Sequence, residues 1–316
     1  MTGGTGYIGR WMLEVLRDAD ARLNLGTQLV VLTRDPESFA DKAPHLAHYK
    51  GFSFVKGNVR GEGWPDGQFD YVIHAATDAS ADLNENNPLL MMDTIIEGTR
   101  KALDFTKAQE KARFVFLSSG AVYGAQPWDV THVDEQYNGG PDCQNPRSAY
   151  GEGKRAAEML CAIYAKQFGL DVVTARIFAA LGPMLSLDIH FAAGNFIRDV
   201  LNGERIIVQG AGDAVRSLLY IADLTCWLWK MLIAAQPGSV YNMGSEDAIT
   251  IADLARRISS VLNGQEIEIL GKPDPGWNPG RYVPSTQLAR KELGLHETVG
   301  LDDMIRRTAI WNGWKA

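Results

Sequence analysis

The sequence has few cysteines and no long apolar run. Its three cysteines, Cys143, Cys161 and Cys226, lie far apart along a chain of 316 residues. This spacing fits neither a disulfide framework nor a metal-binding motif, so we predict no metal and a reducing, cytoplasmic location. No stretch reaches the ~20 consecutive apolar residues that a membrane helix needs, and no basic leader precedes an apolar run. We therefore expect neither membrane insertion nor export.

The sequence also has fewer positively charged than negatively charged residues. The chain has 31 Lys and Arg residues against 38 Asp and Glu residues, which gives a net charge of −7. This balance argues against broad binding of nucleic acid or of anionic membranes. An anionic ligand must therefore be bound by local groups, because the overall charge does not attract it.

The first half of the chain alternates short apolar runs with helical patterns. Four apolar runs predict buried strands, over residues 27–33, 52–55, 71–75 and 114–118. A long helix is expected from about Ser148 to Phe168, with another strand over Asp171–Ile177. Near-continuous apolar strands separated by helices are typical of a parallel sheet covered on both faces. We predict a doubly wound α/β (Rossmann) fold with a smaller C-terminal lobe, in which the Pro- and Gly-rich segment Gly271–Pro284 is a loop.

A glycine-rich turn opens the chain. Gly3, Gly6 and Gly9 are three residues apart, directly before a helical pattern that starts near Trp11. Such glycines permit a tight turn and a close approach of the backbone to a pyrophosphate, while the helix N-terminus supplies free N–H groups. The pattern predicts a dinucleotide site that also includes Tyr7 and Ile8. The alternative is a plain tight turn.

Only Met1 and Thr2 precede this turn, although such a turn normally follows a full central strand. A missing central strand leaves the edges of its neighbours unpaired, at a cost of several hydrogen bonds. We therefore expect a truncated first strand and a weakened or locally remodelled sheet.

Residues after the second strand bear on the choice of cofactor. An acidic residue at this strand end binds the adenosine ribose hydroxyls, whereas Arg pairs with a 2′-phosphate. Arg34 favours NADP, and the adjacent Asp35 favours NAD. Both cofactors stay open.

Tyr150 and Lys154 are four residues apart at the start of the long predicted helix. This spacing places the phenol and the ammonium on one face, a turn apart. Lowering the pKa of a tyrosine from about 10 to about 7 requires roughly 4 kcal/mol, which a nearby cation can supply. Ser119 lies at the end of a predicted parallel strand, where ligands of such sheets bind. The conjunction predicts hydride chemistry on a hydroxyl or carbonyl group.

With these residues identified, the chain resembles the extended short-chain dehydrogenase/reductase family, in its NDP-sugar epimerase/dehydratase branch. The resemblance covers nearly the whole length and rests on these motifs: Gly3–Gly9, Asn58-Val59, His74-Ala75-Ala76, Ser118-Ser119, Tyr123-Gly124, Tyr150/Lys154, Arg176, Gly182-Pro183, Arg216, Tyr220, Asp223 and Arg281-Tyr282. It implies a nucleotide-diphosphate sugar as substrate and NAD or NADP as cofactor. It also implies a homodimer, formed through the helices that contain residues 94–107 and 148–168.

The resemblance also implies roles for single residues. Tyr150 is the acid/base on a sugar hydroxyl, normally at C4; Lys154 holds the nicotinamide ribose, and Ser119 bonds the reacting oxygen. Further residues implied to contact the cofactor are Asn58, Val59, Ala75 and Ala76. The residues implied to bind the substrate diphosphate are Asn195, Arg216 and Arg281, since an arginine fork can bind phosphate oxygens in pairs. His190 and Phe191 are candidates for a further substrate contact.

The resemblance divides the chain into two functional parts. We expect a dinucleotide-binding domain over residues 1–175 plus about 210–245, and a sugar-nucleotide lobe over about 176–209 plus 246–316.

The reaction type depends on the residues after Ser119. Dehydratases of this family usually carry an Asp-Glu pair there and decarboxylating relatives keep a Glu, but this chain has Gly120-Ala121. Neither residue can transfer a proton, so dehydration is disfavoured unless another acid, such as Glu135, reaches the sugar. We predict an epimerase that acts through a transient 4-keto sugar. The alternatives are an NADPH-dependent reductase of a 4-keto sugar nucleotide, a 4,6-dehydratase and a non-catalytic NAD(P)-binding protein. The sequence does not specify the sugar or the nucleotide base.

Overall fold

A computed structural model describes residues 1–77, 81–188, 191–274, 276 and 278–315. The chain forms two compact units, each assembled from segments that are distant in the sequence. Unit 1 comprises Met1–Val122, Gly140–Arg176 and Thr225–Tyr241, and unit 2 comprises Tyr123–Gly139, Ile177–Leu224 and Asn242–Ala316. Residues 123–139, expected in the dinucleotide-binding domain, pack within unit 2. The candidate His190 lies outside the described residues.

Parallel strands form the centre of unit 1. A four-stranded sheet has the order β10 (Val240–Met243), β5 (Asp171–Ile177), β4 (Arg113–Ser119) and β3 (Tyr71–His74). A second sheet pairs β1 (Leu29–Thr33) in parallel with β2 (Phe52–Lys56). Strand β4 is buried from Phe114 to Ser119, as expected for a strand with both faces covered. The predicted parallel α/β fold is confirmed.

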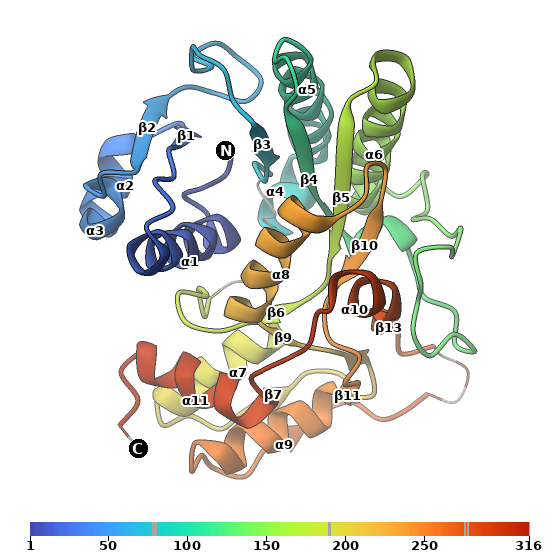
Figure 1. The fold of residues 1–316 in the computed structure, drawn as a ribbon. Helices are drawn as coiled ribbons and strands as arrows, with labels where there is room; N and C mark the ends of the chain where they lie inside the picture. Colours follow the sequence, from blue (N-terminus) through green and yellow to red (C-terminus); the bar gives the residue numbers. More distant parts are fainter. Residues whose placement is uncertain (78–80, 189–190, 275, 277, 316) are drawn as a thin grey trace. The chain divides into compact units, whose positions relative to one another are not determined.

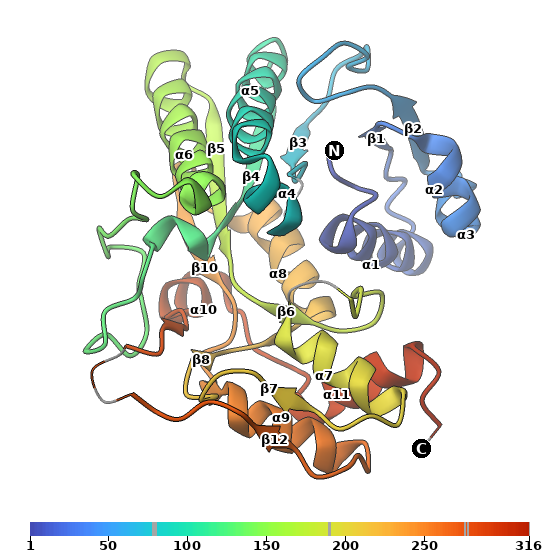
Figure 2. The same cartoon turned by 180° about the vertical axis from the view of Figure 1, so that it is seen from behind.

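Helices cover both faces of the four-stranded sheet (Figures 1 and 2). The long helices α5 (Pro88–Lys107) and α6 (Ala149–Phe168) pack side by side on one face, and α8 (Ile221–Ala234) lies on the other. The apolar sides of α5 and α6 meet β4 in one core, where Ile95, Phe116 and Ala157 are fully buried. Each large apolar side chain buried in this way contributes roughly 1.5–3 kcal/mol to folding. This packing fixes the start of α6 against the end of β4.

The remaining elements of unit 1 are shorter, apart from the first helix. They are α1 (Tyr7–Leu23), α2 (Pro36–Lys42), α3 (Pro44–Ala47), α4 (Ala81–Asn86) and two 3₁₀ turns, η1 (Gly120–Tyr123) and η2 (Pro146–Ser148). None of the helices in the described parts of the chain is both long and apolar enough to cross a membrane.

Met1 and Thr2 lie between β1 and β3. Thr2 forms a single parallel bridge to Leu32 and another to His74. Its N–H donates to the Ile73 carbonyl at 2.9 Å, while the Leu32 N–H donates to the Met1 carbonyl at 2.9 Å. Among the described residues, β1 and β3 are not separated by any strand longer than this. The predicted truncated first strand is therefore confirmed, and the sheet is joined there by two residues.

Unit 2 combines short strands with helices. The strand pairs are β6 (Ala180–Leu181) with β9 (Leu219–Tyr220), β7 (Ile207–Val208) with β12 (Glu268–Ile269), and β8 (Val215–Arg216) with both β11 (Ile249–Thr250) and β13 (Arg281–Tyr282). Its helices are α7 (Ala192–Leu201), α9 (Ile251–Val261), α10 (Gln287–Leu293) and α11 (Leu301–Trp311). The prediction of an uninterrupted loop over Gly271–Pro284 is wrong at β13, because two residues pair with β8 and so short a pairing leaves no periodic pattern.

Candidate active site

The glycine-rich turn leads from Thr2 into α1. Gly3 has a φ of +71°, and a Cβ on it would lie 2.5 Å from the carbonyl carbon of Ala75. A Cβ on Gly9 would lie 2.1 Å from the Gly3 oxygen, so both positions require glycine. At Gly6, by contrast, the nearest described atom would be the Gly3 oxygen at 3.5 Å. The outer side of the turn is therefore open to a ligand.

The N-terminus of α1 has the properties of an anion site. Gly6 is its N-cap, no described side chain caps it, and its first turn, with Tyr7 and Ile8, contains no acidic residue. Free N–H groups and the positive end of the helix dipole together favour a phosphate group. The turn and this helix end fit the pyrophosphate of a nicotinamide dinucleotide.

Two neighbouring charges after β1 have different surroundings. The Asp35 carboxylate accepts a hydrogen bond from the Ser38 N–H at 2.9 Å and thereby caps α2. Arg34 is exposed, and no described residue forms a hydrogen bond or an ion pair with its guanidinium. The cation is therefore available to a ligand, whereas the carboxylate already has a structural partner.

Asn58 and Val59 follow β2 in a compact turn. The Asn58 Oδ1 accepts a hydrogen bond from the Arg60 N–H at 2.9 Å. Val59 packs against α5, since a Cβ on Gly98 would lie 3.1 Å from the Val59 Cγ2. The structure thus fixes both residues on the same unit as the glycine-rich turn.

Close packing places Tyr150 at the beginning of α6. Its backbone N–H donates to the Asn84 Oδ1 at 3.0 Å. Two glycines follow because there is no room for a side chain at these positions. A Cβ on Gly151 would lie 2.9 Å from the Ala121 oxygen, and a Cβ on Gly153 would lie 3.0 Å from the Ile95 Cδ1. The two glycines let α6 approach both α5 and the turn that follows Ser119.

Tyr150 and Ser119 interact directly. Burial raises the pKa of the Tyr150 phenol, and a hydrogen bond with Ser119 partly offsets that rise. The Ser119 Oγ also accepts a hydrogen bond from the Ala121 N–H at 3.1 Å, which fixes its rotamer. In this state Tyr150 is a neutral phenol at neutral pH, so further positive charge is needed before it can act as a base.

Lys154 is only 2% exposed, a turn after Tyr150. Its ammonium donates to the Leu117 carbonyl at 2.7 Å and to the Thr77 Oγ1 at 2.8 Å, and lies 4.8 Å from the centre of the Phe116 ring. Burial lowers the pKa of Lys154 to about 7. The structure therefore places Ser119, Tyr150 and Lys154 at one end of β4.

Two residues that contact this cluster were not identified from the sequence. Thr77 contacts Lys154, and Glu158 accepts a hydrogen bond from Ser118, directly before Ser119. Glu158 could have been identified, because it is four residues after Lys154 and shares its helix face. Thr77 is distant in sequence, and its contact depends on the fold.

His74 lies beneath the glycine-rich turn and is 1% exposed. Its Nδ1 lies 2.8 Å from the Thr2 Oγ1, which also accepts a hydrogen bond from the Ala76 N–H at 3.2 Å. Burial and the charge of Lys154 lower the pKa of His74 to about 3. A neutral imidazole thus supports the segment that lines the turn at Ala75 and Ala76.

The residues expected to bind the diphosphate lie in unit 2. Arg216 on β8 and Arg281 on β13 occupy adjacent parallel strands, where Arg216 is opposite Tyr282. Arg216 donates to the carbonyls of Val215 and Gly280, at 2.9 and 3.3 Å, and burial lowers its pKa. Arg281 is opposite Val215, so the side chains of the two arginines leave these strands on opposite faces, while Asn195 lies on α7.

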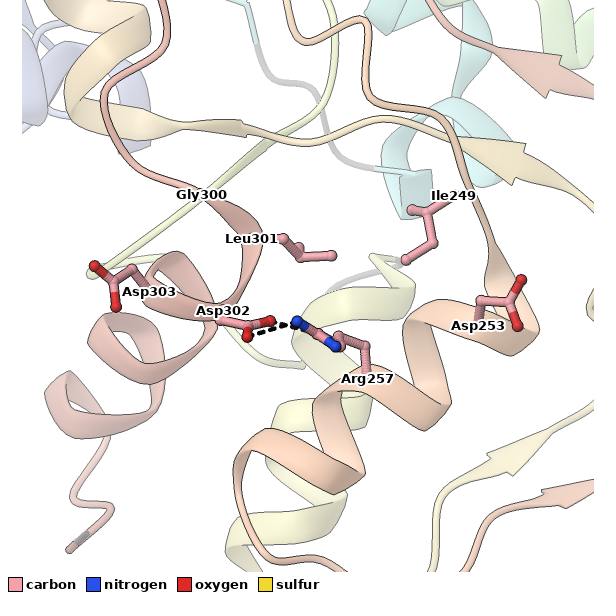
Figure 3. A pocket seen from close by; sticks show the side chains of 7 residues that line it. All are labelled: Ile249, Asp253, Arg257, Gly300, Leu301, Asp302 and Asp303. Atoms are coloured by element: carbon pink, nitrogen blue, oxygen red, sulfur yellow. Dashed lines mark hydrogen bonds and ion pairs between the residues drawn. The ribbon is translucent and has the colours of Figure 1, made fainter.

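Unit 2 also has an open hollow between α9 and the start of α11 (Figure 3). Its lining residues are Ile249, Asp253, Arg257, Gly300, Leu301, Asp302 and Asp303. Arg257, the one cation among them, pairs with Asp302 through two contacts of 2.5 and 2.7 Å. With three carboxylates and a neutralised arginine, this hollow is unsuited to a nucleotide diphosphate.

Comparison with known proteins shows the family of this chain. Residues 1–244 match the model of the NAD dependent epimerase/dehydratase family. The chain is 29% identical to UDP-glucuronic acid decarboxylase 1 of Xenopus tropicalis over 309 residues, which cover 98% of this chain and 70% of that protein.

Two solved structures have the same fold. One is UDP-N-acetylglucosamine 4-epimerase from Methanobrevibacter ruminantium M1, in complex with UDP-N-acetylmuramic acid, with a TM-score of 0.82, 22% identity and coverage of 98% of this chain and 96% of that one. The other is UDP-glucuronic acid 4-epimerase from Bacillus cereus, in complex with UDP-glucuronic acid and NAD, with a TM-score of 0.81, 21% identity and coverage of 98% and 97%. At these identities the likeness shows the fold.

Proposed function

Because this chain belongs to the NAD dependent epimerase/dehydratase family, we propose that it is a nucleotide-sugar epimerase that acts through a transient 4-keto sugar. The observation that carries the proposal is the cluster of Ser119, Tyr150 and Lys154, followed by two residues without a proton-transfer group, Gly120 and Ala121. Such a cluster supports oxidation and reduction at one sugar carbon.

When bound, the nicotinamide ring supplies a reversible acceptor for the hydride at C4. Tyr150 takes the proton of the C4 hydroxyl, and Ser119 hydrogen-bonds the same oxygen as it becomes a carbonyl. The Lys154 ammonium stabilises the phenolate form of Tyr150. Reduction on the opposite face of the rotated keto sugar would then invert C4, and Tyr150 would return the proton to the C4 oxygen, so that no net oxidation occurs.

Neither dehydration nor decarboxylation is expected, although the curated relatives include UDP-glucuronic acid decarboxylases. Gly120 and Ala121 cannot move a proton at C5 or C6. Glu135, the other acid considered, accepts a hydrogen bond from the Asn242 backbone N–H at 2.7 Å within unit 2. That carboxylate already has a structural partner.

The test is to identify the cofactor that copurifies and then to follow a panel of sugar nucleotides by NMR. Exchange between two C4 isomers without added cofactor is the expected result. Stoichiometric consumption of NADPH with a keto sugar would contradict epimerisation, as would a 4-keto-6-deoxy product or loss of CO₂. A protein that binds cofactor and converts no sugar nucleotide would be the non-catalytic alternative.

A reductase is the second candidate, and the surroundings of Arg34 favour it. The unpaired guanidinium suits the 2′-phosphate of NADPH, while Asp35 is occupied as a helix cap. Replacing this cation should weaken NADPH binding about tenfold and leave NADH binding unchanged. Titration of Arg34→Ala with both cofactors, beside the exposed control Lys50→Ala, checks this. Equal loss for the two cofactors would contradict a 2′-phosphate contact.

We also propose a homodimer formed through α5 and α6. These helices expose apolar side chains that water solvates poorly: Leu89 is 70% exposed, Met159 62% and Ile163 37%. Light scattering should give twice the mass of the chain, and Met159→Asp should shift the population towards monomer. A wild-type monomer at micromolar concentration would contradict the proposal.

A further inference from the structure

A partly buried carboxylate on α6 binds the strand that carries Ser119. The Glu158 side chain is 14% exposed, one turn after Lys154. Its Oε1 accepts a hydrogen bond from the Ser118 Oγ at 2.5 Å. Arg176 on β5 orients the carboxylate, because its Nη2 donates to the Oε2 at 2.7 Å and its Nε lies 3.1 and 3.2 Å from the two oxygens.

Lys154 and Glu158 contact consecutive residues of β4. The ammonium binds the Leu117 carbonyl, and the carboxylate binds the Ser118 hydroxyl. The next residue is Ser119, whose hydroxyl contacts Tyr150. One face of α6 is therefore attached to the strand at the two positions that lead to the catalytic serine.

Glu158 also determines the charge around Lys154. Burial favours the neutral amine, and the carboxylate opposes this by favouring the ammonium. Among the described residues, three other titratable groups near the lysine carry no negative charge at neutral pH: burial raises the pKa values of the Cys161 thiol and the Tyr150 phenol, and His74 is a neutral imidazole. In the part of the chain that the structure describes, Glu158 is thus the anion that favours the charged form of this buried lysine.

We propose that Glu158 is a positioning residue that keeps the Lys154 ammonium charged and, through Ser118, fixes the end of β4 at Ser119. The inference rests on the proposed function for the roles of Lys154 and Ser119. It assigns the control of both groups to one carboxylate that is bonded to Ser118 and Arg176.

The test measures the titration of Lys154 by NMR, with lysine labelled at Cε and the resonance assigned by its loss in Lys154→Met. The uncharged variant Glu158→Gln retains a hydrogen-bond acceptor for Ser118. It therefore removes the negative charge and keeps the size and shape of the side chain. We expect it to lower the pKa of Lys154 by about one, which leaves roughly tenfold less ammonium at a pH above that value. In turnover, kcat should fall and its high-pH limb should move to lower pH, while KM changes little.

Glu152→Gln is the matched control. This carboxylate is on the same helix, pairs with Arg155 at 3.8 Å and has no part in the network, so the pKa of Lys154 should not change. If Glu158→Gln does not fold, the double variant Glu158→Gln/Arg176→Gln carries the same test. An unchanged Lys154 titration in the folded variant would overturn the proposal. Because the titration needs neither substrate nor cofactor, its outcome is independent of the proposed epimerase activity.

Discussion

Lys154 and Arg216 are both cations expected to contact a bound ligand, but the protein surrounds them differently. Lys154 is 2% exposed and is held between a long helix and a central strand, with the Glu158 carboxylate a turn away. Arg216 is half-buried on a two-residue strand and donates to two backbone carbonyls. The nearby Arg281 makes one long contact, of 3.4 Å, to the Thr131 carbonyl.

This difference in surroundings predicts different effects of the two cations on catalysis and on substrate binding. A group held rigidly in a buried position can stabilise charge that develops in a transition state, which raises kcat. A cation on short strands retains the freedom to adjust to phosphate oxygens, and it stabilises ground state and transition state alike. Substitutions in unit 1 should therefore change kcat, and those at the arginines of unit 2 should change KM.

The largest expected effect comes from removing the phenol oxygen. Tyr150→Phe should lower kcat by roughly 1,000-fold, because general acid–base catalysis typically contributes 10²–10⁴-fold. Cofactor affinity should persist, since the glycine-rich turn and Lys154 are unchanged. NMR assays of turnover and fluorescence titration with the cofactor check the two parts. Near-normal turnover would remove Tyr150 from the mechanism.

Substitution of the arginines in unit 2 should change KM and leave kcat nearly unchanged. Arg216→Ala or Arg281→Ala should raise KM by about 10- to 100-fold with little change in kcat, because a hydrogen bond to a charged group is worth about 1.5–3 kcal/mol. Steady-state kinetics on the identified substrate provide the measurement. The control is Arg306→Ala, at an exposed arginine on α11 that is paired with Asp303. A fall in kcat at unchanged KM would contradict the assignment of these arginines to ground-state binding.

The same contrast explains what the sequence could predict. The sheet, α6 and the glycine-rich turn rest on local patterns: apolar runs, the four-residue spacing of Tyr150 and Lys154, and glycines that a turn requires at Gly3 and Gly9.

Contacts made over long sequence distances could not be predicted. Thr77 binds Lys154 across 77 residues, and β13 pairs with β8 across a segment whose Pro and Gly content indicates a loop. Neither depends on a periodic pattern, since each requires strands and helices to be placed first. The roles expected for Asn195, Arg216 and Arg281 came from family resemblance and stay predictions.

The smallest expected effect is on the pH dependence of stability, and it arises from the buried His74 in unit 1 without any ligand. His74 is neutral in the folded protein, with a pKa of about 3, while in the unfolded chain its pKa is near the ordinary 6.5. As the pH falls below 6.5 the unfolded chain takes up a proton that the folded protein does not, so stability present above pH 6.5 is lost. From pH 6.5 to about pH 5.5 this loss amounts to about 1 kcal/mol.

His74→Phe removes this titration and keeps an aromatic ring beside Phe114 and Phe116, while Thr2 still accepts the Ala76 N–H. Its free energy of unfolding should therefore depend less steeply on pH than that of the wild type, by about 1 kcal/mol over that interval. Urea unfolding at both pH values provides the measurement, with the exposed His48→Phe as control. Equal slopes for His74→Phe and the wild type would mean that the imidazole takes up a proton equally in the folded and the unfolded states, which would contradict a pKa lowered by burial.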